Sequence, residues 1–250
     1  TIKTLNGKIL FWEDHYFRLM ASMRILRMEI PMAFTPESLE SQILELLRHH
    51  NSNSNSFRVK FTVFRNQGGF YTPHTNDVSY FITAESLEAD LYLLNTSDYR
   101  VELFKDFYVT PGLLSTLKTN NKVLNVLGSV YAKENQYDNC LLLNTNKSIV
   151  EALNGNLFLV KDKVIKTPPL EDGCLKGIMR KQILEIIKKI PDFECVEASI
   201  SPFELQKADE LFVTNVIQGI QPITAFRKKN FTTTVSQSIL AKLNMTVRLS

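Results

Sequence analysis

The run Val109-Thr110-Pro111-Gly112 constrains the fold of this chain more than any other feature, because the pattern of the sequence changes there. Proline and glycine interrupt both helical and strand periodicity. We therefore predict a small N-terminal domain over residues 1–109, a linker over residues 110–117 and a larger C-terminal domain over residues 118–250. A chain of 250 residues is long enough to bury a core in each of two modest domains.

The residues before this boundary mix helical and strand patterns. Asn6-Gly7 stands between two short apolar runs, which predicts a two-residue hairpin. Thr35-Pro36-Glu37 predicts the start of a helix, since threonine caps a helix well and proline suits its first turn. The other elements predicted here are a helix over residues 13–28, the end of the second helix near residue 50, a polar loop over residues 51–56, and strands over residues 57–64, 78–84 and 100–108.

The residues after the boundary follow a different order, in which helices and short strands alternate irregularly. The predicted helices cover residues 119–133, 178–189 and 232–243. The predicted strands cover residues 140–143, 156–160, 164–166, 194–199 and 211–214. Taken together, the two halves predict an α+β protein.

Composition argues against several classes of function. With 44% hydrophobic and 22% charged residues the chain has the make-up of a globular protein, and a net charge of +3 is too small to indicate nucleic acid or a membrane surface. No apolar run approaches the roughly 20 residues of a membrane span. Cys140, Cys174 and Cys195 are odd in number and lack paired spacing, which argues against a disulfide framework and a zinc site. We expect free thiols in a cytoplasmic protein, with no metal.

Four stretches carry the functional signal, although each of them is ordinary by itself. They are His15-Tyr16-Phe17-Arg18-Leu19, Leu117-Lys118-Thr119-Asn120-Asn121-Lys122, Glu151-Ala152-Leu153-Asn154-Gly155-Asn156-Leu157-Phe158 and Gly177-Ile178-Met179-Arg180. In this order and at this spacing the chain resembles the pyridoxal-phosphate enzymes of aminotransferase class IV, also called fold type IV. The resemblance extends from Thr1 to about Leu243. It implies a small N-terminal α/β domain, a larger C-terminal domain with a β-barrel-like core and flanking helices, and a homodimer.

The resemblance also assigns roles to particular residues. Lys118 would form a Schiff base with pyridoxal phosphate, and Glu151 would face the pyridine nitrogen and make the ring an electron sink. Backbone groups at the start of a helix bind anions, so Ile178 and Met179 would hold the cofactor phosphate. The remaining predicted phosphate ligands are Arg18, whose guanidinium can grip phosphate bidentately, and the donors of Asn215 and Val216.

Three features favour 4-amino-4-deoxychorismate lyase, which forms 4-aminobenzoate and pyruvate on the way to folate, over the other activities of the family. Met179 stands where the aminotransferases usually have threonine. Asn215 falls where lyases also have asparagine. Thr1 lies where lyases have a threonine thought to protonate the eliminated product, a role that a hydroxyl can perform.

Two features point the other way. The stretch Arg65-Asn66-Gln67-Gly68-Gly69-Phe70 resembles a lyase loop, but Phe70 replaces a second arginine that would grip a substrate carboxylate, which leaves Arg65 as the candidate substrate ligand. Lys122 stands where branched-chain enzymes have a tyrosine beside the cofactor, so no subfamily matches fully. The alternative is an aminotransferase acting on an amino-acid-like substrate, either a branched-chain L-amino acid or a D-amino acid. A cofactor-binding protein without turnover is a third class. The resemblance also leads us to expect residues upstream of Thr1 that line the active site.

Overall fold

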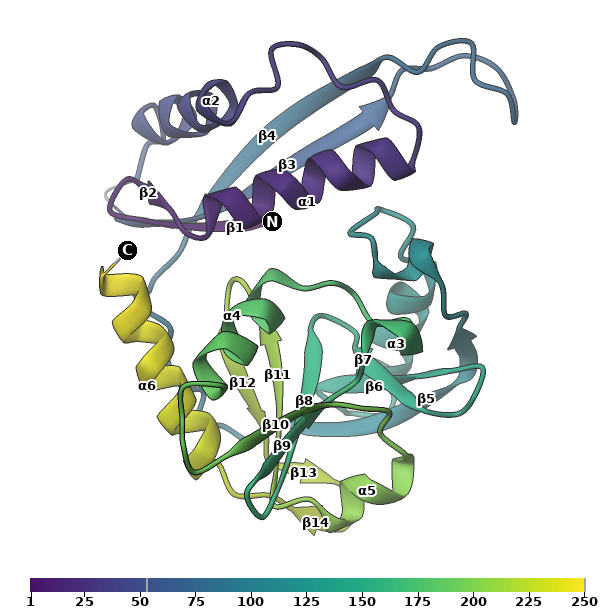
Figure 1. The fold of residues 1–250 in the computed structure, drawn as a ribbon, viewed down its shortest axis with the longest axis vertical. Coiled ribbons are helices and arrows are strands. Elements are labelled where there is room, and N and C mark those ends of the chain that lie inside the picture. Colours follow the sequence, from purple (N-terminus) through teal and green to yellow (C-terminus); the bar gives the residue numbers. More distant parts are fainter. Residues whose placement is uncertain (53, 250) are drawn as a thin grey trace. The chain divides into compact units, whose positions relative to one another are not determined.

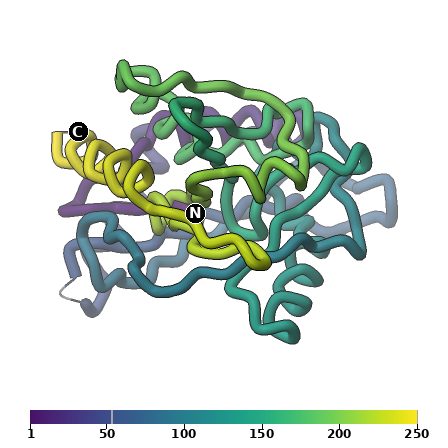
Figure 2. The backbone as a smooth tube through the Cα atoms, turned by 90° about the horizontal axis from the view of Figure 1, so that it is seen from below, coloured from purple at the N-terminus to yellow at the C-terminus, as the bar shows by residue number. Residues whose placement is uncertain are grey.

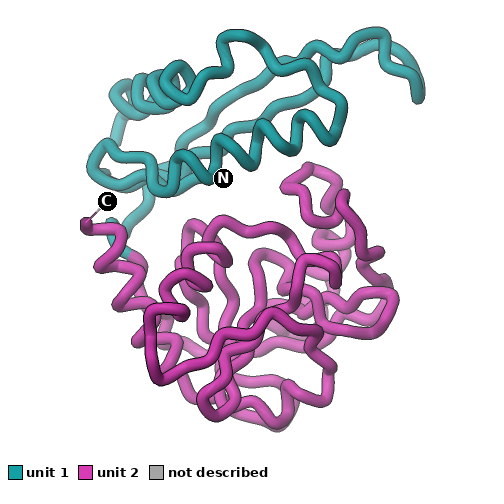
Figure 3. The backbone as a smooth tube through the Cα atoms, viewed as in Figure 1, with its two compact units in different colours: residues 1–91, 250 teal, residues 92–249 magenta. Residues whose placement is uncertain are grey.

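The computed structural model describes residues 1–52 and 54–249, and these divide into two compact units, Thr1–Leu91 and Tyr92–Leu249 (Figure 3). Residue 53 of the predicted polar loop and residue 250 at the end of the predicted second domain lie outside the described residues. The division falls before the predicted boundary at residue 109. The reason is long-range pairing: strand β5 (Arg100–Val109) pairs in parallel with β6 (Asn139–Asn144), so it belongs to the second unit.

The first unit is built on a four-stranded sheet with the order β2-β1-β3-β4 (Figure 1). Asn6 and Gly7 join β1 to β2 with positive φ angles of 49° and 74°, which confirms the predicted hairpin. Threonine at position 35 caps the second helix by accepting the N–H of Ser38, as expected. The elements are β1 (Ile2–Leu5), β2 (Lys8–Ile9), α1 (Trp12–Ile25), α2 (Pro36–Arg48), β3 (Ser56–Arg65) and β4 (Val78–Ser86).

Both helices of this unit pack on one face of the sheet. The predicted alternation in β3 is confirmed, since Phe57 and Val59 are buried while Arg58 between them is exposed. Ile43 of α2 joins these two β3 residues in one apolar cluster. The methionines of α1 pack with Leu39 of α2 in a neighbouring cluster that also includes Phe61 of β3. Burial of these side chains against the sheet is the main apolar stabilisation of the unit.

The second unit contains two five-stranded sheets, with the orders β14-β13-β5-β6-β7 and β10-β9-β8-β11-β12 (Figure 1). Apolar side chains from β5, β6 and β7 meet those from β8, β11, β12 and β13 in one core cluster. The sheets approach at the turn after β7, where the N–H of Ala152 donates to the carbonyl of Gly155 at 2.9 Å. The remaining strands are β7 (Ile149–Ala152), β8 (Asn156–Lys161), β9 (Val164–Thr167), β10 (Glu194–Glu197), β11 (Glu210–Asn215), β12 (Gly219–Ile223), β13 (Ala225–Phe226) and β14 (Lys229–Asn230).

Helices cover the outer faces of these two sheets. Helix α3 (Val123–Glu134) packs through Ala132 against Phe104 and Leu142 of β5 and β6. Helices α4 (Ile178–Ile187) and α6 (Thr234–Leu249), the latter drawn in yellow in Figure 2, contact each other and the strands β11 and β12. A short helix, α5 (Pro202–Lys207), lies between β10 and β11. The observed architecture is the predicted α+β arrangement, with a barrel-like core and flanking helices.

Candidate active site

Lys118 lies on a non-helical connection at the edge of the second unit. The 3-10 turn η1 (Leu113–Thr116) precedes it, and Leu117 next to it is buried while Lys118 itself is exposed. The predicted helix from residue 119 begins only at Val123, with Lys122 as its N-cap residue. Threonine and asparagine side chains at positions 119–121 compete with the helical backbone, which explains the later start. The connection is anchored where Lys176 donates its backbone N–H to Thr116 at 3.1 Å.

Glu151 is a buried carboxylate on β7. It lies directly opposite Leu142 of β6, and residues that face each other across two strands point to the same side of the sheet. That side is the one covered by α3, whose first turn is fixed by a 2.7 Å hydrogen bond from Asn125 Nδ2 to the carbonyl of Leu153. Burial raises the pKa of Glu151 above its ordinary value. The N–H of Leu175 and the charges of Lys122 and Lys118 act in the opposite direction on that pKa, so both lysines influence this carboxylate electrostatically.

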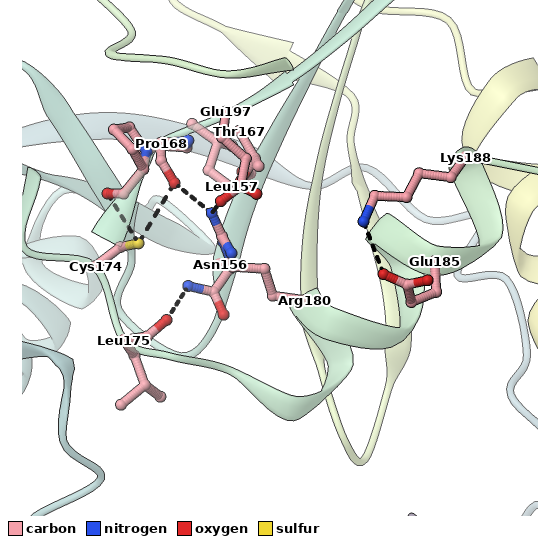
Figure 4. Close-up of polar contacts among 11 residues, drawn as sticks. Asn156, Leu157, Thr167, Pro168, Cys174, Leu175, Arg180, Glu185, Lys188 and Glu197 are labelled. Atoms are coloured by element: carbon pink, nitrogen blue, oxygen red, sulfur yellow. Dashed lines mark hydrogen bonds and ion pairs between the residues drawn. The ribbon is translucent and has the colours of Figure 1, made fainter. Parts of the chain in front are cut away.

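Residues 174–177 connect the parts of the site. The N–H of Leu175 donates to Glu151 Oε2 at 2.9 Å. The carbonyl of Leu175 accepts from Asn156 Nδ2 at 2.8 Å (Figure 4). The backbone N–H of the next residue, Lys176, donates to the carbonyl of Thr116 in the connection before Lys118. The sequence predicted neither Leu175 nor Asn156 as part of the site. Asn156 does belong to the run that follows Glu151, and that is the signal by which it could have been found.

The start of α4 provides a set of backbone donors. Gly177 is the N-cap residue and supplies no capping side chain, and the first N–H groups of a helix have no partner within the helix. Ile178 and Met179 occupy the first two helical positions and are buried, at 4% and 1% exposure. A Cβ on Gly177 would overlap Asn156 Oδ1, so the helix start and Asn156 are in close contact. This arrangement favours an anion.

A second loop lies beside this helix start. Thr214 of β11 is opposite Asn156 of β8, so the turn that follows β11 begins next to Gly177. Asn215 fixes that turn, because its Oδ1 accepts the N–H groups of Ile217 at 3.1 Å and Gln218 at 2.9 Å. The carbonyl of Val216 accepts from the hydroxyl of Tyr92 at 3.0 Å. The side chain of Asn215 therefore shapes the loop, and backbone groups are what the loop can offer a ligand.

Three predicted site residues belong to the first unit. Thr1 precedes β1 and is half-buried, as is Arg18 on α1. Burial, and secondarily the charge of Arg18, lowers the pKa of His15 well below its ordinary value. Arg65 donates from Nη2 to the carbonyl of Leu26 at 2.7 Å and from Nη1 to Arg27 and Asn76, which ties the end of β3 to the chain after α1.

Within residues 1–52 and 54–249 there is no cluster of three or more His, Cys, Asp or Glu side chains that could hold a metal ion. The same residues include no helix long and apolar enough to cross a membrane.

Comparison with known proteins gives the family. The model of the family described as amino-transferase class IV matches residues 1–226. The chain belongs to the class IV aminotransferase family. Enzymes of this family depend on pyridoxal phosphate, and this chain is therefore a pyridoxal-phosphate enzyme of the aminotransferase and lyase group.

Individual relatives carry different names. A protein from Methanocaldococcus jannaschii proposed to be a branched-chain-amino-acid aminotransferase is 28% identical over 223 residues, covering 89% of this chain and 75% of its own. The aminodeoxychorismate lyase of Vibrio harveyi is 24% identical over 227 residues, covering 90% and 80%. The branched-chain aminotransferase of Thermobaculum terrenum, solved in its pyridoxal-phosphate form, matches with a TM-score of 0.86 at 20% identity and covers 98% of this chain and 83% of its own. The last similarity establishes the fold.

The residues of the second unit fit the family's cofactor. A buried carboxylate with two lysines acting on it can face a ring nitrogen, and the uncapped start of α4 can receive a phosphate. These are features of the second unit itself.

Proposed function

We propose that the protein is a lyase that converts 4-amino-4-deoxychorismate to 4-aminobenzoate and pyruvate. This choice rests on the hydrogen bonds that the side chain of Asn215 makes. Its side-chain oxygen closes the turn over residues 215–218 through two backbone hydrogen bonds. Asparagine at this position is one of the features by which the sequence resembles the lyases. The relative named aminodeoxychorismate lyase, which matches 90% of this chain, adds support.

Each residue has a defined task in this proposal. The bound cofactor supplies an electron sink that weakens bonds at the carbon bearing the amine. Lys118 would hold the cofactor through Nζ, and the same Nζ would take the proton from that carbon. Glu151, fixed by Leu175, would face the pyridine nitrogen. Backbone groups of Ile178, Met179, Asn215 and Val216, together with Arg18, would hold the phosphate.

The elimination itself needs two proton movements and one bond cleavage. The ring carbon bearing the amine loses its proton to Lys118, and the bond between the ring and the ether oxygen of the enolpyruvyl group breaks. Thr1 then gives a proton to the methylene carbon of the departing enolpyruvate, which becomes pyruvate, while the ring becomes aromatic. We propose Arg65 as a ligand for a substrate carboxylate. In this role it would have to share the bonds that it makes with Leu26, Arg27 and Asn76.

The proposal includes a cytoplasmic, folate-pathway setting and a homodimer. Support for a second copy comes from α3, which exposes an apolar stripe at helical spacing. The members of this stripe are Val123, Val126, Leu127 and Val130, with exposed fractions between 41% and 65%.

The test is to load the purified protein with pyridoxal phosphate, add freshly made aminodeoxychorismate and follow the fluorescence of 4-aminobenzoate. We expect release that falls at least 10³-fold in Lys118→Ala and is unchanged in Lys163→Ala, a control at an exposed lysine between β8 and β9. No release would refute the lyase assignment. Bleaching of the cofactor absorbance by an L-branched-chain or D-amino acid would then support the aminotransferase, which is the activity named for two of the relatives. A cofactor-loaded protein inert to all three substrates would support a binding protein without turnover.

A further inference from the structure

Thr214 carries a buried hydroxyl that makes no hydrogen bond to the described residues. Its side chain is 1% exposed, and Oγ1 has no hydrogen-bond partner. Buried polar groups in folded proteins are nearly always paired, and leaving one unpaired destabilises the fold. The hydroxyl of Thr214 therefore has a hydrogen-bonding capacity that a ligand atom could satisfy.

The strand register shows which way this hydroxyl points. Leu211 and Val213 of β11 belong to the core between the two sheets, so the alternate residues Phe212 and Thr214 face the other side. Thr214 lies opposite Asn156, and paired residues share a face. On that face Asn156 contacts the helix start at Gly177. The unpaired hydroxyl and the uncapped N-terminus of α4 are therefore on the same side of the sheet and next to the same asparagine.

The side chains of Met179, Val216 and Asn215 offer little to an anion. Met179 and Val216 have no hydrogen-bonding group suited to phosphate, and the side chain of Asn215 is occupied within its own turn. A phosphate at the start of α4 would be held by backbone N–H groups and would accept one more bond from a nearby hydroxyl.

We infer that Thr214 is a phosphate ligand of the cofactor, with Oγ1 donating a hydrogen bond to a phosphate oxygen of pyridoxal phosphate at the N-terminus of α4. This inference rests on the cofactor of the family and not on the proposed lyase reaction. The measurements below use no substrate, so their outcome is independent of which reaction the enzyme performs.

The experiment compares two ligands that differ only in the phosphate, pyridoxal phosphate and pyridoxal, by titration against Thr214→Val. Valine keeps the shape of threonine and removes the hydroxyl. We expect the dissociation constant for pyridoxal phosphate to rise about tenfold or more, the size typical of a lost hydrogen bond to a charged group, while that for pyridoxal changes less than twofold. Inorganic phosphate should raise the melting temperature of the cofactor-free wild type more than that of the variant.

Two controls make the test specific. Thr167 is also buried, but its hydroxyl donates to the carbonyl of Leu157 at 2.7 Å (Figure 4). Thr167→Val should therefore destabilise the cofactor-free protein without changing the preference for pyridoxal phosphate over pyridoxal. Thr214→Val, which removes an unpaired hydroxyl, should leave the cofactor-free protein at least as stable as the wild type. Thr214→Ser keeps the hydroxyl and should retain the preference for the phosphorylated ligand.

Three results would overturn the inference. They are equal affinity of wild type and Thr214→Val for pyridoxal phosphate, an equal loss of affinity for both ligands, and a destabilisation of the cofactor-free variant as large as that of Thr167→Val. The last result would mean that the hydroxyl of Thr214 is already paired within the protein. If Thr214→Val does not fold, the Thr214→Ser titration decides the matter, because a lost phosphate preference in that variant would contradict the role of a hydroxyl.

Discussion

Gly177→Ala is expected to damage both the stability of the second unit and its affinity for the cofactor. Gly177 has φ −73° and ψ 139°, which alanine adopts readily, so the substitution causes no backbone strain. The added Cβ, however, would overlap Asn156 Oδ1. Asn156 is 3% exposed, so it cannot move away without giving up its 2.8 Å hydrogen bond to the carbonyl of Leu175.

The magnitude follows from these contacts. Leaving the buried amide and carbonyl unpaired costs about 1–3 kcal/mol. Replacing glycine by alanine also lowers the conformational entropy of the unfolded chain, which offsets about 0.4–1 kcal/mol of this cost. Taking the middle of each range, the net loss is about 1.3 kcal/mol, which corresponds to a fall in melting temperature of about 3–5 °C for a chain of this size. Because the helix start moves with Asn156, the affinity for pyridoxal phosphate should fall as well.

Thermal unfolding of a double-mutant cycle tests this reasoning. Gly112→Ala is the matched control, since a Cβ at Gly112 would meet no atom within 4 Å. Asn156→Ala removes the side chain that the new Cβ would strike, so in that background Gly177→Ala should cost much less than in the wild type. The reasoning is refuted if Gly177→Ala is as harmless as Gly112→Ala, or equally harmful with and without Asn156.

Two further predictions concern the buried carboxylate and the surface of α3. Burial raises the pKa of Glu151 above its ordinary 4.5, so the folded protein keeps this proton to higher pH than the unfolded chain, and the carboxyl lowers stability as pH rises from about 4.5 towards the folded pKa. In cofactor-free Glu151→Gln this pH dependence disappears, so the melting temperature of the variant should rise relative to that of the wild type as pH increases. A difference in melting temperature that does not change with pH would contradict the raised pKa of Glu151. Turnover of loaded Glu151→Gln should fall by roughly 10²-fold, the usual loss when one fixed electrostatic partner is removed. Val126→Asp places a charge in the apolar stripe of α3 and should convert a dimer to a monomer by light scattering, and a dimer that persists would show that the stripe is not the interface.

Local signals in the sequence were sufficient for most of the helices and for the first unit. Threonine at position 35 followed by proline marks the start of α2, and the alternation from Phe57 marks β3. A similar local signal was available for α5 and was missed: Ser201 and Glu204 form a capping box, in which each side chain bonds to the backbone of the other residue. Strand β12 was missed because Pro222 argues against a strand, yet proline is tolerated there because β12 is at the edge of its sheet.

Long-range contacts explain what the sequence could not show. The domain boundary was predicted at residue 109 from a local proline and glycine, while the structure divides the chain near residue 91 because β5 pairs with β6. Lys118, Glu151 and the start of α4 were each predicted as site elements from the resemblance. Their connection through Leu175 and Asn156 depends on hydrogen bonds between residues 19 and 24 positions apart, which no local pattern reveals.

The attachment of the cofactor to Lys118 is the central claim, and reduction with borohydride tests it most directly. The loaded protein would be reduced, digested and mapped by mass spectrometry for a lysine carrying the pyridoxyl phosphate group. Lys122 provides an internal control, because it is four residues away and its charge also acts on Glu151. We predict modification of Lys118 alone in the wild type and none in Lys118→Ala. Modification of Lys122 or of another lysine in the wild type, or no modification at all, would contradict the account.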